Sequence, residues 1–578
     1  MRPLSVVVIG AGVGGLAAAI RLGAAGHSVT VLERNDAVGG KLARYTRDGF
    51  SFETGPSLLT LPSVFDDLLA LAGTSLAATC GPLRLDPSFA YRFADGTGFR
   101  ARSSLGATVA AVEDLAPGSG ARWQAFHDHG RRVWQVSQRT FFAGAMESPV
   151  ALARRMRSPA DLLAIDPLRT LAHRASTAFG DPRLRQWAGR YATYAGSSPY
   201  RAPATLSCIP YIEQAFGCWY LRGGLPTLAG ALCDAATSLG VVVRTGCDVV
   251  AIRTHELGAP ASGNATGAPQ QAAAPPGGPA QRARTRSGRG VMARAGVGAV
   301  AAGAGARRVV AGAGMGAVAA RARACGVVAS ARGRAVTASG GVSGVVLADG
   351  EVLAADVVVS DADAHHLYAD LLADPRRLRR VRRAGQSSSG FVLLAAVDGT
   401  TPGMAHHNVS FSADYRHEFA QIFDEAVPPS DPTIYVAVSS VTDPAQAPPG
   451  TENWSVLVNV PSGHHLDWSC LGPRYAEQVL AVMARRGWDL EGRLRWYETI
   501  TPAEIESRYR AVGGAIYGSS SNGRRSAFLR AANRGPVPGL YLVGGSAHPG
   551  GGLPIVAMGG AIVADMVADD VASGWEQR

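Results

Sequence analysis

Three glycines near the amino terminus have the spacing that brings a backbone loop close to a phosphate-bearing ligand. Gly10, Gly12 and Gly15 follow the apolar run 4–9, and a helix-forming stretch begins directly after them. Gly10 permits a tight turn, Gly12 lets backbone approach a pyrophosphate, and Gly15 allows close packing of helix on strand. The unpaired N–H groups at the start of that helix then face the phosphates. The pattern predicts a dinucleotide site.

A carboxylate follows at the distance where dinucleotide-binding folds hold a ribose. Glu33 ends a second apolar run, 28–32, and its oxygens can accept hydrogen bonds from both ribose hydroxyls. The same charge disfavours a 2′-phosphate, so NADP is not expected. The pair Gly39-Gly40 and then Lys41, the only lysine of the chain, favour a larger cofactor. Lys41 is expected beside a diphosphate or flavin edge, or alternatively as a solvated loop residue.

The elements that must position these groups belong to a long and rather apolar chain. It has 578 residues, 47% hydrophobic and 17% charged, which is enough for two or three domains and excludes overall disorder. The formal net charge of +11 first suggests a nucleic-acid or membrane partner. Eleven arginines and no acidic residue lie within 257–341, however, and the rest of the chain carries 45 basic and 45 acidic residues. No nucleic-acid partner is therefore expected for the body of the protein.

The basic segment 257–341 is rich in alanine and glycine and has no aromatic residue. Such a composition cannot bury enough apolar surface to offset the ordering entropy, which predicts a disordered insertion. The alternative is an arginine-rich arm that touches anionic lipid or RNA. The flanking stretches 247–256 and 343–363 are typical of strands, with a turn at Asp349-Gly350, so the insertion interrupts a hairpin region.

Cysteine and histidine spacing gives no sign of a metal site. The seven cysteines form no CxxC pair, which fits a reducing compartment rather than zinc or disulfides.

No apolar run is long and clean enough for a transmembrane helix. Arg2 followed by eighteen uncharged residues resembles a signal peptide, but the glycine motif favours a cytoplasmic strand–helix unit.

Several longer stretches carry a family resemblance. GAGVGGLAAAIRL, LERNDAVGGKL and DGFSFETGPSLLTLP stand near the amino terminus, RYATYAGSSPYRAPA at 190–204, CWYLRGGLPTLA at 218–229, and GLYLVGGSAHPGGGLP at 539–554. Together they resemble the phytoene-desaturase family of FAD-dependent carotenoid desaturases over nearly the whole chain except 257–341. Many flavoproteins share the first motif, whereas the last block and the Tyr-Ala-Gly-Ser-Ser-Pro block are far more specific.

The resemblance implies an α/β fold in which a Rossmann-type FAD domain is assembled from discontinuous segments and an α+β substrate domain is inserted. The expected ranges are 1–75 for the first FAD segment, 76–205 for the helical part of the substrate domain, 206–256 and 342–370 for the second FAD segment, 371–515 for the β-rich part of the substrate domain, and 516–578 for the last FAD segment.

The resemblance also implies the residues that would hold FAD. They are Gly10, Gly12, Gly14, Gly15, Glu33, Gly40, Lys41, Gly55, Pro56, Val249, Gly544 and Ser546. A helix starting near Pro554 is expected to point its positive end at the flavin N1/O2 edge. Ser546 and Ala547 stand where related amine oxidases carry an Asp that contacts the ribityl chain, so the chain departs from those relatives there.

Desaturation passes a hydride from substrate to flavin N5 and needs an acceptor for the second proton. Asp181 and Glu213 are the candidate acceptors, with Arg185, Arg190 or Arg222 nearby. Asp181 precedes Pro182, and the alternative for it is a helix N-cap.

Two further residues are candidates for the flavin side of the site. Arg222 follows a Trp-Tyr-Leu strand that, in this family, runs towards the flavin; the alternative is a surface arginine. His548 is expected to line the flavin face, or else to be a turn histidine satisfied by backbone.

The expected function is FAD-dependent desaturation of a carotenoid or related polyene. Alternatives are a carotenoid oxygenase, a polyene isomerase or an amine oxidase on the same scaffold, and less favoured, a non-enzymatic isoprenoid-binding protein. The expected partners are a lipophilic polyene, a membrane surface contacted peripherally, and an electron acceptor such as quinone or oxygen. Arg154, Arg155 and Arg157 beside Leu152 and Met156 are candidates for the entrance from the membrane; the alternative is a solvated helix face.

Overall fold

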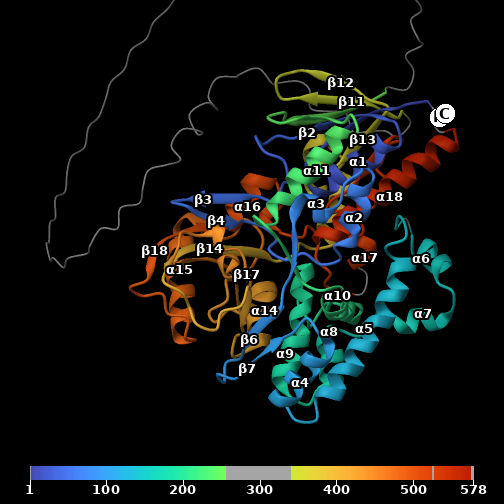
Figure 1. Cartoon of the computed structure of the whole chain (residues 1–578). Coiled ribbons are helices and arrows are strands. Elements are labelled where there is room, and N and C mark those ends of the chain that lie inside the picture. The colour runs from blue at the N-terminus through green and yellow to red at the C-terminus, as the bar shows by residue number, and fades with distance from the viewer. Residues whose placement is uncertain (1, 147, 256–339, 524–525, 575–578) are drawn as a thin grey trace, which may run out of the picture. The chain divides into compact units, whose positions relative to one another are not determined.

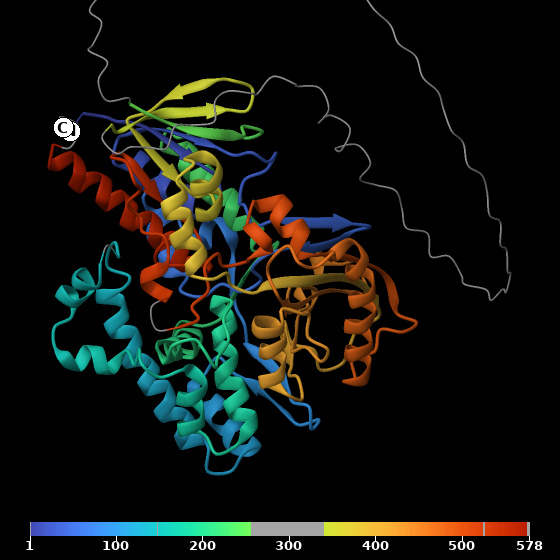
Figure 2. The same ribbon diagram turned by 180° about the vertical axis from the view of Figure 1, so that it is seen from behind.

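The computed structural model describes residues 2–146, 148–255, 340–523 and 526–574 (Figures 1 and 2). The predicted disordered insertion at 257–341 lies outside the described residues, apart from Gly340 and Gly341. The strands on either side of it, β10 (Val249–Thr254) and β11 (Val342–Leu347), pair antiparallel, and β12 (Val352–Ala354) extends this sheet after the turn at 349–350. The two ends of the insertion therefore leave from neighbouring strands.

A five-stranded parallel sheet carries the glycine loop at the end of its central strand. The strand order is β19-β13-β1-β2-β9, with bounds β1 Ser5–Ile9, β2 Ser28–Leu32, β9 Val242–Arg244, β13 Val357–Ser360 and β19 Leu540–Leu542. Val6 and Val8 pack on one face, and Val7 and Ile9 pack on the other. Apolar side chains on both faces are typical of a parallel sheet that is covered on each side. The predicted α/β fold with a Rossmann-type sheet is confirmed.

Helices cover one face of this sheet, and a small sheet covers the other. The helices are α1 (Val13–Ala24), α11 (Pro226–Ser238) and α18 (Leu553–Ala572), which pack together in Figure 1. The opposite face meets the β10–β11–β12 sheet and the π-helical segment η3 (Leu367–Leu371). Sequence segments more than 500 residues apart, α1 and α18, thus lie side by side beneath the glycine loop.

A seven-stranded sheet forms the second part of the molecule. Its order is β18-β14-β17-β16-β15-β6-β7, with bounds β6 Phe89–Arg92, β7 Gly98–Ala101, β14 Ser389–Asp398, β15 His407–Ser410, β16 Ile434–Ala437, β17 Thr451–Val460 and β18 Leu494–Ile500. Helix α15 (Trp468–Arg485) packs its apolar side on one face of this sheet. The other face is partly open and borders the cavity described below.

The range 76–205 is mixed rather than helical, which corrects the expectation for this range. It contains β5 (Pro82–Arg84) and the hairpin β6–β7, whose first strand pairs parallel with β15. Phe89 and Tyr91 alternate with outward-facing residues, and this period of two favours a strand. The pairing with β15 is remote in sequence, and no local pattern announces it.

Helices make up the remainder of that range and its continuation. Their bounds are α4 Leu105–Leu115, α5 Gly120–Thr140, α6 Pro149–Arg155, α7 Pro159–Ala164, α8 Leu171–Ala178, α9 Pro182–Arg190, η1 Tyr191–Ala195, η2 Ala204–Ser207 and α10 Cys208–Phe216. Helices α5 and α10 pack against each other, and α6 and α7 lie at the periphery of the helical part in both views.

Candidate active site

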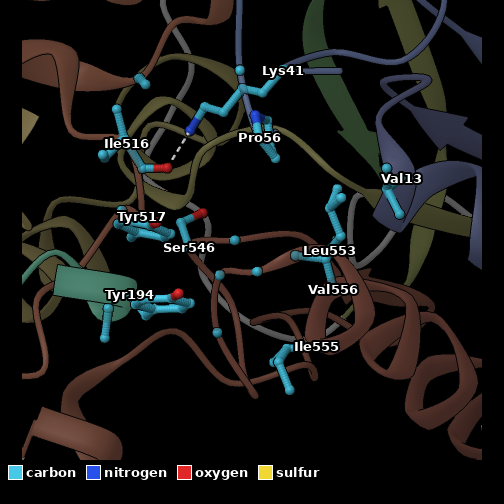
Figure 3. A pocket seen from close by; sticks show the side chains of 18 of the residues that line it. Val13, Lys41, Pro56, Tyr194, Ile516, Tyr517, Ser546, Leu553, Ile555 and Val556 are labelled. Atoms are coloured by element: carbon cyan, nitrogen blue, oxygen red, sulfur yellow. Dashed lines mark hydrogen bonds between the residues drawn. The ribbon is translucent and has the colours of Figure 1, made fainter. Parts of the chain in front are cut away.

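One continuous cavity of about 950 Å³ joins the glycine loop to the space between the seven-stranded sheet and the helices. Its walls come from β1, β2, α9, α10, the strand ends near β13 and β19, and the start of α18. Figure 3 shows Lys41 and Pro56 on one side of it and Tyr194 on the other, with Ser546 and Tyr517 between them. The cavity therefore has a phosphate-cradle end and an apolar end that meet in the middle.

The glycine loop packs so tightly against neighbouring atoms that it leaves no room for side chains. Gly10 has a φ of +95°, a region that favours glycine. A Cβ at residue 15 would collide with the carbonyl oxygen of Gly10. Gly12 is the N-cap of α1 and has no side-chain cap, which leaves the first N–H groups of the helix free to face a ligand.

Glu33 lines the cavity at the end of β2 and is held rigidly. Its Oε2 accepts a hydrogen bond from the Ala11 N–H at 2.9 Å, and its Oε1 accepts from the N–H and side-chain amide of Asn35. The carboxylate therefore ties the glycine loop to the second strand. Lone-pair capacity remains on the side facing the cavity, as a ribose would require.

Nine of the predicted cofactor residues line the cavity: Gly10, Gly12, Glu33, Gly40, Lys41, Gly55, Pro56, Val249 and Ser546. Gly14, Gly15 and Gly544 stand behind its wall, where a Cβ at any of them would meet neighbouring atoms. At Gly55 a Cβ would collide with the Lys41 carbonyl. Because these glycines leave room that any side chain would fill, the cradle fits the diphosphate and ribityl portion of FAD.

Sequence reasoning missed two acids of this cradle, Asp361 and Asp363, which follow β13 and line the cavity near Lys41. Burial raises the pKa of Asp361 to about 7, and a backbone hydrogen bond from Gly15 opposes the rise. Burial likewise raises the pKa of Asp363, and burial lowers the pKa of Lys41. The Lys41 ammonium donates to the carbonyl of Ile516 at 2.8 Å (Figure 3). The sequence signal that could have identified Asp361 is an acidic residue directly after the apolar strand 357–360.

The carboxyl-terminal glycine loop closes the middle of the cavity. The Ser546 hydroxyl accepts a hydrogen bond from the Ala364 N–H at 2.8 Å. Arg530 donates to the carbonyls of Gly545 and Ser519 at 2.6 and 2.7 Å and holds the loop in place. Helix α18 begins at Leu553, so its amino terminus borders the cavity beside Ser546 (Figure 3).

Among the described residues, Asp181, Arg222 and His548 do not line the cavity. Asp181 is the N-cap of α9, and its carboxylate accepts from the Arg183 N–H and pairs with the Arg183 guanidinium. Arg222 is exposed. His548 is buried and its Nε2 lies 2.9 Å from the Phe141 carbonyl, which joins the carboxyl-terminal loop to the end of α5. In this structure Asp181 caps a helix and His548 joins two segments of backbone, and neither side chain faces the cavity.

Glu213 and Arg190, which sequence reasoning considered beside Asp181, do line the cavity. The hydroxyls of Tyr191 and Tyr194 donate to Glu213 at 2.9 and 2.6 Å. Burial raises the pKa of Glu213, and Arg190 opposes that rise. Arg185, by contrast, donates to the carbonyls of residues 179 and 180 and is not part of the cavity wall.

The Arg190 guanidinium is buried among aromatic rings. Its Cζ lies 4.5 Å from the ring centre of Phe89 and 5.2 Å from that of Tyr194. Within the described part of the chain its hydrogen bonds are long, to the Tyr91 hydroxyl at 3.2 Å and the Tyr194 hydroxyl at 3.4 Å. We call Arg190, Tyr91, Tyr191, Tyr194 and Glu213 the Arg190 cluster. It places a buried cation and a buried acid beside the leucine, isoleucine and aromatic side chains of the chamber.

The far end of the cavity reaches α6 and α7. Leu152, Leu162, Ile165 and Leu168 line it there. Ten large apolar side chains of the described residues are exposed, and four of them cluster in 150–168: Val150 at 58%, Leu162 at 49%, Leu163 at 79% and Leu168 at 66%. We call these four residues the apolar rim.

The arginines predicted at the entrance divide into two kinds. Arg154 and Arg157 are exposed next to the apolar rim. Arg155 instead donates to the carbonyls of Thr140, Gly144 and Ala145, and so anchors α6 to the end of α5. No helix in the described ranges has the length and apolar character needed to cross a bilayer. The same residues contain no group of three or more potential metal ligands.

Comparison with known proteins agrees with this geometry. Residues 13–270 match the family model described as flavin-containing amine oxidoreductase. Over 574 residues the chain is 31% identical to a 4,4′-diapolycopene oxygenase of Methylomonas sp, covering 98% of each chain. It is 28% identical to a 4,4′-diaponeurosporene oxygenase of Staphylococcus aureus over 97% of each. An oxidoreductase from Methanosarcina mazei shares the fold, with a TM-score of 0.55, 15% identity, and coverage of 97% of this chain and 99% of that one.

Proposed function

Because the chain belongs to the flavin-containing amine oxidoreductase family, among its carotenoid-pathway enzymes, we propose that it oxygenates the end of an acyclic polyene. It is an FAD-dependent oxidoreductase. The bound flavin supplies the acceptor for the hydride that leaves a substrate C–H bond. The protein then has to bind a long apolar molecule, hold one of its carbons at that acceptor, and keep bulk water out.

The observation that carries the proposal is the continuity of the cavity. Its phosphate-cradle end and its apolar end meet beside Ser546, Tyr517 and Tyr194 (Figure 3). An extended polyene that enters from α6 and α7 would therefore present one end of its chain at the junction. Walls of leucine, isoleucine and aromatic residues favour a hydrocarbon and offer no counter-charge for an amine near the rim.

The Arg190 cluster could serve a role in oxygenation that simple desaturation does not require. A hydrocarbon that only loses hydrogen needs no hydrogen-bonding partner, whereas the Arg190 guanidinium, whose hydrogen bonds to Tyr91 and Tyr194 are long, can donate to an oxygen atom of a product. An alcohol or aldehyde formed at the chain end gives that guanidinium an acceptor, and Glu213 can accept or return a proton through the Tyr194 hydroxyl. The two full-length relatives named above are both called oxygenases. In the net reaction, one dioxygen would convert a terminal methyl group into an aldehyde and one water; the two reducing equivalents that formation of the alcohol consumes would be returned to the flavin when the alcohol is oxidised to the aldehyde.

Desaturation is the second candidate. The resemblance of the 190–204 and 539–554 blocks to carotenoid desaturases favours it, and hydride removal needs little beyond correct placement of the C–H bond. In that case Glu213 would take the proton from the neighbouring carbon, and the acceptor of electrons could be a quinone or oxygen.

Pigment analysis distinguishes the two reactions. The names of the relatives contain two polyenes, 4,4′-diaponeurosporene and 4,4′-diapolycopene. When this chain is expressed in cells that accumulate either polyene, we expect the polyene to be converted to products that contain oxygen. Mass spectrometry under isotopically heavy dioxygen should find the label in the product. Products that lose only two hydrogens would show a desaturase, and an unchanged pigment in every such host would contradict both.

We also propose peripheral attachment to a membrane through the apolar rim. Carotenoid-like substrates partition into lipid, and two residues of the exposed rim, Leu162 and Leu168, also line the cavity. Arg154 and Arg157 lie beside it and would meet anionic headgroups. Insertion of a few apolar side chains with flanking arginines is typical of proteins that lie on a bilayer rather than span it.

Replacing Val150 and Leu163 of the apolar rim with serine should weaken binding to anionic phospholipid vesicles at least about tenfold, since each buried side chain contributes about 1.5–3 kcal/mol. Vesicle co-sedimentation measures this. The matched control is Val242→Ser with Val352→Ser, which removes two exposed valines elsewhere, at 54% and 48%. Equal loss of binding in both double variants would contradict the proposed docking face.

A further inference from the structure

Asp361 occupies the centre of the glycine cradle. It directly follows β13, and its carboxyl group packs against the backbone of the first glycine loop and of Gly544. A Cβ at Gly14 would lie 2.7 Å from its Oδ1, and side chains at Gly12 or Gly544 would collide with the same carboxyl. The glycines therefore make room for this acid as well as for a ligand.

The position creates an electrostatic conflict for a diphosphate cofactor. Two phosphate charges and an ionised carboxylate in a shielded cavity repel one another strongly. Glu33 faces the same region from β2 and adds negative charge. Asp363 lines the cavity two residues further on, where Lys41 and Arg530 face it. Lys41 is the cation that faces both aspartates, and its ammonium group also donates a hydrogen bond to the Ile516 carbonyl. The first glycine loop and the Gly544 loop contribute no ionisable side chain there.

We propose that Asp361 is a cofactor-binding residue that acts as a neutral acid, so that binding of FAD takes up one proton. In its protonated form the carboxyl group donates a hydrogen bond towards the phosphate-bearing part of FAD and keeps its hydrogen bond from the Gly15 N–H. This role does not depend on which substrate the enzyme oxidises. Failure of the pigment experiment would leave it untouched.

The direction of the pH dependence follows from the acid. Burial raises the pKa of Asp361 to about 7 before any cofactor charge is present, and bound phosphates would raise it further. Below about pH 7 the proton is already in place and FAD affinity is constant. Above it, each molecule of FAD must bind together with a proton, so affinity falls by about tenfold per pH unit.

The test is titration of the full-length apoprotein with FAD, followed by flavin fluorescence, between about pH 6 and about pH 9. Wild type should weaken by about tenfold per unit above about pH 7. Asp361→Asn, which keeps the shape and stays neutral, should bind as tightly at high pH as wild type does at low pH. Asp361→Ala should also lose the pH dependence and should bind more weakly than Asp361→Asn at every pH, because it lacks the donor.

A matched control is Glu53→Gln. Glu53 also lines the cavity, and burial raises its pKa to about 7, but it accepts its hydrogen bond from the Leu225 N–H and lies outside the glycine cradle. Its replacement should leave the pH dependence of FAD affinity in place. Riboflavin, which lacks phosphate, should bind without the high-pH loss. The proposal is overturned if Asp361→Asn retains the wild-type pH profile, if Glu53→Gln removes it, or if riboflavin shows it equally.

Discussion

Gly15→Ala should yield a protein that purifies without its yellow flavin. The added methyl group would collide with the carbonyl oxygen of Gly10, which the parallel sheet holds at the end of β1. Because the obstructing atom belongs to the backbone, no flexible side chain can move aside. Overpacking costs about 1–3 kcal/mol, and the loop must shift where N–H groups meet phosphate. We therefore expect FAD affinity to fall by at least about a hundredfold.

The measurement is the flavin absorbance per mole of purified protein, with FAD titration of whatever apoprotein is obtained. Gly230→Ala is the matched control, because that glycine lies within α11 and a Cβ there has no neighbour within 4 Å. It should keep full flavin content and gain helix stability of about 1 kcal/mol. Circular dichroism must show that Gly15→Ala is folded. A folded Gly15→Ala protein with wild-type flavin content would refute the steric argument.

The cradle was predictable from sequence because its information is local. Strand, glycine turn, helix and acid succeed one another within residues 4–33, and the structure has β1, α1 and β2 at those places. The helix predicted from about Pro554 is α18, which begins at Leu553. Each of these elements is specified by neighbours in sequence, through β-branched runs, glycine turns and helix-forming stretches.

The substrate chamber was not predictable, because remote segments build it. Tyr91 lies 99 residues from Arg190 in sequence, and the two meet only because β6 joins β15 in the large sheet. Glu213 gave a weak signal as a lone acid in the apolar stretch CIPYIEQAF. Its partners Tyr191 and Tyr194 could not be assigned without the fold, since a short helical turn brings both hydroxyls to one carboxylate.

Asp181 and His548 lie outside the cavity wall, and each has the structural role that was its alternative interpretation. At Asp181 the Gly-Asp-Pro sequence indicates an N-cap. Its carboxylate accepts a hydrogen bond from the Arg183 N–H at the start of α9, as an N-cap aspartate does. At His548 burial against the α5 terminus takes the imidazole away from the cavity. A polar residue in a family motif can therefore have a structural role instead of a catalytic one, and its position relative to the cavity distinguishes the two.

Arg190→Met should slow oxidation of a polyene that carries a terminal alcohol by at least about a hundredfold while FAD stays bound. Methionine fills similar space among the rings of Phe89 and Tyr194 but provides neither charge nor donors. Loss of one preorganised donor at a site of developing charge typically costs this much. Arg190→Lys should recover little, since an ammonium lacks the planar fork that reaches both phenols.

The measurement is single-turnover reduction of the bound flavin by a polyene, together with flavin content and thermal unfolding. Arg185→Met is the matched control, because Arg185 lies on the same helix α9 but donates only to the carbonyls of residues 179 and 180. It should react at the wild-type rate. If oxygenation is the reaction, Arg190→Met should impair oxidation of a terminal alcohol more than that of the hydrocarbon, because only the alcohol offers an acceptor to the guanidinium. Rates within about threefold of wild type for both substrates would remove the Arg190 cluster from the mechanism, since that difference is under 1 kcal/mol.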